Sequence, residues 1–407
     1  MSFTHKWAKL ALFNFVILAS VGLLLRYKIL FPLPVVDHKH LMHGHSHFAF
    51  AGWVSLALYI AIIHLLQPNE IEKKQFNRLL WVHQISSYGM LFTFPFMGYA
   101  APSIAFSTFS ILISYWFTIL VWRKIKSLST VTFEKKWLYA ALICNIVSSA
   151  GTFALAYMMV NKILLQNWYF GAVYFYLHFQ YNGWFLFTIL GLLFVYLSNW
   201  MNALQIKRSN LFFQLLVISV IPAWFLSMLW MNVPTWMYYA AVAAAVVQLI
   251  AVYFFIQILF ENRKSILPGL HPMTKWLWIF SGLAFLLKII MQALSSVQEL
   301  NKYAFGIRPI VIGFLHLVLL GFVSLFMLGY FFQHQLLFLN KQQAKKGIWL
   351  FITGVLLNEF ILMLQGIAAI SYSDIPYANY MLLVAAFIMF SGLFMLLTGQ
   401  KNNIQPS

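Results

Sequence analysis

The stretch HFAFAGWVSL begins at His47 and sets out a pattern of a histidine, four residues, a glycine and an aromatic residue. The same pattern returns as HFQYNGWFLF from His178 and as HLVLLGFVSL from His316. The three histidines are 131 and 138 residues apart, and each interval has room for four membrane-spanning helices. The pattern therefore predicts an all-α chain built from three pseudo-symmetric units of four helices.

The composition of the chain is that of a membrane protein. It has 407 residues, of which 62% are hydrophobic and 8% are charged, whereas soluble domains are about 25% charged. The net charge is +18, but the basic residues lie in short loops between apolar runs and form no patch for nucleic acid. We therefore expect a polytopic protein in a lipid bilayer, with no nucleic-acid partner.

Apolar runs of about 20 residues predict twelve transmembrane helices in a single transmembrane domain, residues 1–407. The first run is read as a retained helix, because no cleavage site of small residues follows it. The expected helices are 7–26, 41–66, 79–100, 102–122, 137–160, 171–196, 211–231, 236–260, 275–297, 309–333, 347–371 and 377–398.

The distribution of Lys and Arg predicts the orientation of these helices. With both termini inside, 19 of the 26 basic residues fall in inner loops and tails, 6 fall in outer loops and Lys288 falls within a span. Inner loops of membrane proteins carry this excess. We expect cytoplasmic termini and a bacterial inner membrane.

The three repeated histidines are expected at one depth. Each lies six or seven residues inside a helix that runs from outside to inside, which is roughly 10 Å below the outer boundary. A polar side chain facing lipid is costly, so the histidines are expected to face the interior around a common axis. The alternative is that each serves helix packing and hydrogen bonding between helices.

The start of the second helix is rich in histidine. Five histidines lie within ten residues, at positions 38, 40, 43, 45 and 47, and on a helix His43 and His47 share a face while His45 points elsewhere. Imidazole binds iron, copper and zinc, so the tract is a candidate metal or cofactor site. It can also be an interfacial cluster or a helix cap. The single cysteine, Cys144, supplies no cysteine-based metal motif.

Twelve helices with histidines on the outer side of helices 2, 6 and 10 resemble subunit I of the heme-copper oxidases. The His-x-His run also resembles the NnrS family of heme- and copper-associated membrane proteins. The resemblance implies one heme, of b type, with His47 and His316 as axial ligands, and His45 or His43 as replacements for His47. It places His178 at a copper site and makes His47, His178 and His316 the candidate metal ligands.

The chain departs from the oxidase pattern at three places. The expected helix 211–231 contains no histidine, where the oxidases carry a pair. The residues flanking His316 are apolar, so a second histidine of helix 10 is missing. Asn182 stands where the oxidases have a tyrosine, and Tyr181 lies one residue earlier. These departures predict an incomplete copper site and no ordinary reduction of oxygen.

Other polar residues lie within or beside the spans. Lys288 and Glu359 are expected in mid-membrane, where a charge is costly unless it is paired or hydrated. They are candidates for an ion pair or a proton path. Arg308, Arg26 and Lys28 are candidates for binding heme propionates, or are ordinary interfacial anchors.

The leading hypothesis is a heme-binding membrane protein for electron transfer or for handling nitric oxide or oxygen, with an electron donor or partner subunits. Whether it is an oxidoreductase is left open. One alternative is a transporter or channel without a cofactor. The other is a copper or zinc handling protein that uses the histidines of helix 2.

Overall fold

The computed structural model describes residues 2–128 and 134–400, and the described chain is all-α. Its helices form two compact units. Unit 1 contains Met1–Lys124 and Met327–Ser407, and unit 2 contains Ile125–Phe326. The two ends of the chain thus fold together in unit 1, and the middle of the chain packs by itself as unit 2.

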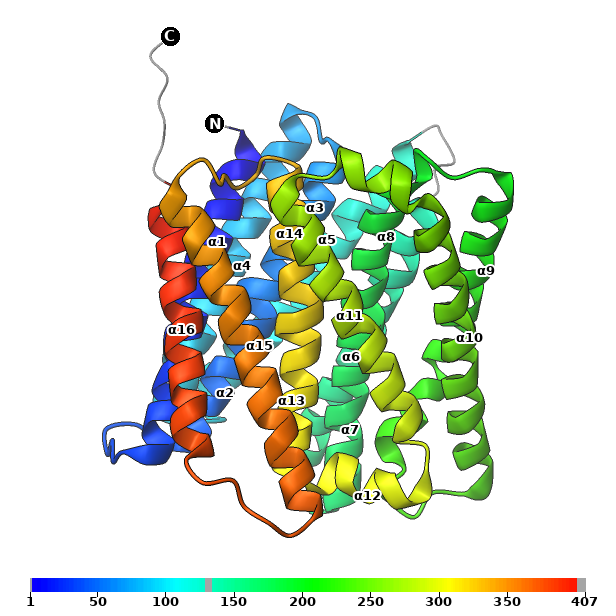
Figure 1. Cartoon of the computed structure of the whole chain (residues 1–407). Coiled ribbons are helices and arrows are strands. Elements are labelled where there is room, and N and C mark those ends of the chain that lie inside the picture. Colours follow the sequence, from blue (N-terminus) through cyan, green and yellow to red (C-terminus); the bar gives the residue numbers. More distant parts are fainter. Residues whose placement is uncertain (1, 129–133, 401–407) are drawn as a thin grey trace. The chain divides into compact units, whose positions relative to one another are not determined.

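Unit 1 holds the N-terminal helices and the C-terminal pair (Figure 1). Its second span changes from α-helix to π-helix and back without a break. The elements are α1 (Phe3–Leu30), α2 (His38–Phe48), η1 (Ala49–Ser55), α3 (Leu56–Leu66), α4 (Glu70–Met97), α5 (Ala101–Ser127, whose last residues belong to unit 2), α14 (Leu325–Gln333), α15 (Gln342–Ile370) and α16 (Ala378–Thr398).

Unit 2 holds the helices of the middle of the chain, and two of its spans also contain a π-helical segment. The elements are α6 (Glu134–Val160), α7 (Gln166–His178), η2 (Phe179–Trp184), α8 (Phe185–Ser198), α9 (Ala203–Val220), η3 (Pro222–Met228), α10 (Thr235–Ile266), η4 (Leu267–Gly269), α11 (Pro272–Leu294), α12 (Gln298–Gly306), α13 (Arg308–His316) and η5 (Leu317–Ser324).

Ten helices of the described chain are long and apolar enough to cross a membrane. The count becomes 11 if α9 and η3, which are bent by 48° at their junction, form one span. The expected span 79–100 corresponds to α4, which begins earlier, at Glu70, and does not pass this test. Its middle carries the polar residues His83, Gln84, Ser86 and Ser87, all of them buried.

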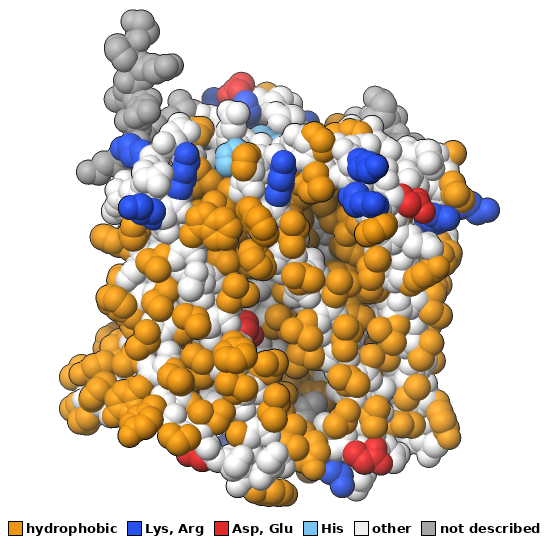
Figure 2. All heavy atoms as spheres, viewed as in Figure 1, with side chains coloured by type: hydrophobic (Ala, Val, Ile, Leu, Met, Phe, Trp, Pro, Cys, Tyr) orange, Lys and Arg blue, Asp and Glu red, His pale blue; other side chains and the backbone are white. Residues whose placement is uncertain are grey.

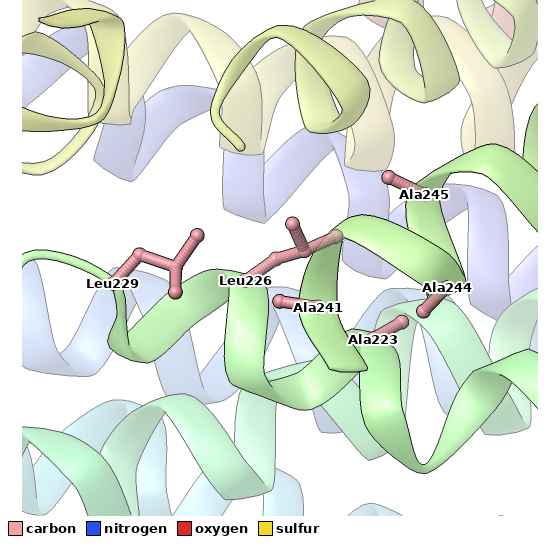
Figure 3. Close-up of a cluster of buried hydrophobic side chains, with 6 residues drawn as sticks. All are labelled: Ala223, Leu226, Leu229, Ala241, Ala244 and Ala245. Carbon is pink, nitrogen blue, oxygen red and sulfur yellow. The ribbon is translucent and has the colours of Figure 1, made fainter. Parts of the chain in front are cut away.

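The bend between α9 and η3 has a sequence cause. Pro222 has no N–H and cannot continue the α-helical ladder, so the chain turns into a short 3-10 helix. Figure 3 shows how small side chains let α10 lie close to this segment. The buried cluster is Ala223, Leu226, Leu229, Ala241, Ala244 and Ala245.

Helices α15 and α16 of unit 1 pack through glycines. A Cβ atom on Gly392 would lie 2.5 Å from the backbone nitrogen of Phe351, and one on Gly347 would lie 2.6 Å from the carbonyl oxygen of Gly392. Such contacts leave no room for a side chain. Small residues in these positions are typical of helices that pack inside a bilayer.

In unit 1 the start of α1 and the end of α16 lie at the same end of the helices (Figure 1). Two contacts describe this end: His5 Nδ1 donates to Leu336 O at 2.9 Å, and Gln400 Nε2 donates to Phe338 O at 2.7 Å. Figure 2 shows hydrophobic side chains covering α15 and α16 between their ends, and Lys and Arg side chains where α15 begins. An apolar belt of this kind indicates contact with lipid.

Candidate functional site

Each of the three repeated histidines opens a π-helical segment. His47 lies two residues before η1, and His178 and His316 directly precede η2 and η5. No other π-helical segment occurs in the described chain. A π-helical turn is rare, appears mostly as a single turn inside an α-helix, and is frequently found at functional sites. The pattern seen in the sequence thus marks a shared local backbone structure in three spans.

Neighbouring helices supply hydrogen bonds to the π-helical segments. In unit 1, Asn14 Nδ2 donates to Gly52 O at 2.8 Å and His83 Nε2 donates to Ala51 O at 2.9 Å. In unit 2, Ser281 Oγ donates to Phe322 O at 2.7 Å. These carbonyls belong to the repeated glycine or to an adjacent residue, so the widened turns are held by polar side chains.

His83 thus has a different place from the one expected. A position near the inner end of the expected span 79–100 predicts an interfacial residue, but the side chain is 1% exposed and bonded to η1. Its partner, the Ala51 carbonyl, lies 32 residues away in the chain. The spacing of residues in one helix contains no information about such a partner.

The histidine-rich tract lies on α2, which begins at His38 rather than near residue 41. Asp37 caps the helix by accepting a hydrogen bond from the His40 N–H at 2.9 Å, which fixes the first turn earlier than expected. His38 and His40, expected in the loop, therefore belong to the helix.

His43 and His47 share a face of α2, as the spacing predicted. The His47 ring stacks on Phe94 with centroids 4.2 Å apart, and its Nε2 lies 3.3 Å from the Tyr99 hydroxyl. The His43 ring meets the edge of Tyr99 at 4.7 Å. His45 points elsewhere, toward α1, where a Cβ atom on Gly22 would lie 3.1 Å from its ring. The Nδ1 atom of His45 is buried and has no hydrogen-bond partner in the described chain.

His178 is engaged by protein groups at both ring nitrogens. Nε2 lies 2.7 Å from the carbonyl oxygen of Val220, which can only accept, so Nε2 carries the proton. Nδ1 then accepts from Asn182 Nδ2 at 3.0 Å. Val220 is the last residue of α9, directly before the bend, and His178 satisfies a carbonyl at this interruption of the helix.

The described residues contain no group of three or more His, Cys, Asp and Glu side chains that could hold a metal ion. Copper also does not fit His178 as it stands, because a metal would have to replace the bond to Val220 or the bond to Asn182. Of the histidines at positions 43, 45 and 47, the structure brings His43 and His47 to one face of α2, whereas His45 faces α1.

His316 ends α13 in unit 2, and Arg308 begins the same helix with an exposed side chain. In unit 1, the Lys28 ammonium donates a hydrogen bond to the Leu33 carbonyl, and Arg26 lies two residues earlier on α1.

Lys288 is the most unusual polar residue of unit 2. Its side chain is fully buried, and its Nζ has no hydrogen-bond partner among the described residues. Its Nζ lies 5.9 Å from the centroid of the Phe285 ring. Glu359, considered as its partner, belongs to unit 1, where it accepts a hydrogen bond from Asn358 at 3.0 Å.

The packing of α11 against η5 sets the level of Lys288. Ser281 bonds to Phe322, and a Cβ atom on Gly321 would lie 3.1 Å from Ala284. The two helices run in opposite directions, so the next turn of α11 brings Lys288 to the level where α13 passes into η5. Within unit 2, Lys288 thus lies near the depth of His316.

Comparison with known proteins gives no further assignment. No protein-family model and no curated protein matches the chain.

Proposed function

We propose that the chain is a heme-binding integral membrane protein of the type of heme-copper oxidase subunit I, serving electron transfer or the handling of nitric oxide or oxygen. The observation that carries this proposal is the π-helical segment that follows each of the three repeated histidines. Three such segments beside the same residue type support a function common to these spans. Twelve spans in three units of four, with cytoplasmic termini in a bacterial inner membrane, complete the proposal.

The first axial ligand is assigned to the His43 and His47 face of α2. The His47 ring stacks on Phe94, and its hydrogen bond to the Tyr99 hydroxyl, at 3.3 Å, is long and neutral. The aromatic side chains around it suit the apolar surface of a porphyrin. The second ligand, His316, lies in the other unit and is assigned from the resemblance alone.

A copper ion is not part of the proposal. The two hydrogen bonds of His178 give this side chain a structural role, and the expected helix 211–231 has no histidine to complete a copper site. Heme bound by two histidines has no open position on iron, which favours electron transfer. Binding by one histidine leaves a position for a small gas.

The test is the reduced-minus-oxidised visible spectrum of the protein purified in mild detergent after expression with ample heme. We expect sharp heme bands that disappear in His47→Ala and in His316→Ala. His40→Ala is the matched control, because His40 lies on the same helix but outside the proposed ligand set. A flat spectrum of the unmodified protein would end the heme proposal.

A transporter or channel is the second candidate, and Lys288 is the observation that favours it. Charged residues buried within spans mark pathways for ions or protons, and the bend between α9 and η3 gives unit 2 a broken helix. The protein, reconstituted into liposomes that enclose a pH-sensitive dye, would then move protons across the liposome membrane. Lys288→Met would stop the movement, whereas an unchanged rate, or no flux in the unmodified protein, would remove this candidate.

A further inference from the structure

Unit 1 brings two histidines together at the end of its helices where α1 begins. His64 lies in the last turn of α3, and His334 directly follows α14. Their ring centroids are 5.1 Å apart, with an angle of 60° between the planes. In the sequence, His64 lies near the end of the expected span 41–66 and His334 directly follows the expected span 309–333, so nothing in the spacing relates them to each other.

The separation of the rings fits a shared metal ion. With metal–nitrogen distances of about 2.1 Å and tetrahedral angles, two imidazole rings on one ion have centres about 5 Å apart. Among the described residues, no side chain or backbone group forms a hydrogen bond with either imidazole ring. Gln67 Nε2 donates a hydrogen bond to His64, but to its backbone carbonyl oxygen. Lone pairs of both rings are therefore available for a ligand.

Water can reach the pair. The side chain of His334 is exposed, which gives an ion access to the ring from solvent. A neutral imidazole can donate a ring lone pair to such an ion.

The aromatic neighbour of the pair holds one ring in place. The Tyr330 ring lies 4.3 Å from the His334 ring and 6.3 Å from the His64 ring. Its hydroxyl donates to Ala61 O at 3.4 Å, one turn before His64. Tyr330 therefore positions the two segments relative to each other and is itself committed to the backbone.

The pair also follows the internal pattern of the sequence. His64 lies 17 residues after His47, and His334 lies 18 residues after His316. The π-helical segments between them differ by one residue as well, with 7 residues in η1 and 8 in η5. The corresponding positions of the middle span are Val195 and Tyr196, so the repeat supplies two imidazoles and no third.

We propose that His64 and His334 together bind one divalent transition-metal ion, Zn²⁺, Ni²⁺ or Cu²⁺, with water completing the coordination. Imidazole prefers these ions to Mg²⁺ and Ca²⁺. The ion joins the end of α3 to the segment after α14, and so it stabilises the folded state of unit 1. The site is independent of the proposed heme, which is assigned to the opposite end of the same span.

The experiment uses the full chain, purified with an affinity tag that contains no histidine and stripped with a chelator. Titration with Zn²⁺ and Cu²⁺ gives affinity and stoichiometry, the Cu²⁺ electron paramagnetic resonance spectrum gives the number of bound nitrogens, and the melting temperature gives the stabilisation. We expect one site with two nitrogens, and a higher melting temperature with Zn²⁺ but not with Mg²⁺.

Variants locate the site. His64→Asn and His334→Asn should each weaken binding at least tenfold and leave one nitrogen, and the double variant should lose the site. His64→Cys and His334→Cys restore a ligand and should keep Zn²⁺ binding, which separates lost coordination from misfolding. His40→Asn, at the other end of the span, is the matched control. Unchanged affinity in both single Asn variants, or an equal loss in His40→Asn, would overturn the proposal.

Discussion

His47 and His178 occupy the same place in the repeated pattern, yet the protein uses them differently. His178 is bonded at both nitrogens, to Val220 and to Asn182, and is 1% exposed. His47 is partly exposed, stacks on Phe94 and has one long bond to a hydroxyl. The His178 side chain thus completes the hydrogen bonding at the bend after α9, whereas the His47 ring is less committed to protein partners and is the better candidate to bind a cofactor.

The reason for the difference lies in the helix that each histidine meets. Beside His178, Pro222 breaks the α-helical ladder between α9 and η3. The Val220 carbonyl at this junction therefore needs a hydrogen-bond donor from another helix. Beside His47, the bonds that hold η1 come from Asn14 and His83. A histidine at a repeated position is therefore structural where no other donor serves the neighbouring backbone.

The largest expected effect is on stability in His178→Ala. This substitution leaves Val220 O and the Asn182 amide nitrogen without these partners, which costs about 2–6 kcal/mol, because each unsatisfied buried group costs about 1–3 kcal/mol. His47→Ala removes one stacking contact and one long bond, and costs about 1 kcal/mol. The free energies of unfolding of the two variants can be compared by titration with a denaturing detergent, with unfolding monitored by circular dichroism.

His178→Gln serves as the control for this comparison, because its amide can donate to Val220 O and should recover part of the loss. Equal losses in His178→Ala and His47→Ala would show that the hydrogen bonds of His178 do not distinguish the two positions.

Two glycines of the pattern, Gly183 and Gly321, should differ in the cost of an added side chain. A Cβ atom on Gly183 would lie 2.5 Å from Cys144 Cβ, whereas one on Gly321 would lie 3.1 Å from Ala284 Cβ. Gly183→Ala should therefore cost about 2 kcal/mol through overpacking, and Gly321→Ala less than about 1 kcal/mol. The same unfolding measurement applies.

A double variant tests the cause of the Gly183 effect. Cys144→Gly removes the atom that a new side chain would meet, and should reduce the cost of Gly183→Ala. If the two substitutions are additive, the close contact between the helices is not responsible.

A smaller, pH-dependent effect is expected at His334, a histidine of a third kind. Its pKa is about 4 in the folded protein and 6.5 in the unfolded chain, so the unfolded state binds more protons between these values. Stability should fall as the pH is lowered from about 6.5 to 4 and should be unaffected above that window. Melting temperatures of the metal-free protein and of His334→Ala measure this, and the variant should show a weaker slope.

The smallest effect is expected at the start of α2, which presents the histidines. The hydrogen bond from the His40 N–H lowers the pKa of Asp37 below its usual value. The cap is therefore present above the ordinary pKa and is lost as the pH falls through the lowered one. Asp37→Ala should speed amide exchange at His40, whereas Asp37→Asn, which still caps, should not. Equal exchange in both variants would argue against the cap.

Much of the fold follows from local sequence. The apolar runs predicted spans that the structure supports at ten or 11 places, and the i, i+4 spacing placed His43 and His47 on one face. The capping residues Asp37 and Asn69 begin α2 and α4, and both signals were present in the sequence. The short helix α12, between two expected spans, was not predicted, because its charged and polar residues resemble those of a loop.

By itself, the sequence determined that this is a helical membrane protein and that three of its spans share a pattern. Hydropathy and spacing are properties of one helix at a time, and they can be counted along the chain. Only the tertiary structure decided what each histidine does. The partners of His178, His83 and His64 come from residues 42, 32 and 270 positions away. A hydrogen bond or a shared ligand depends on atoms brought together by packing, and no single helix carries that information.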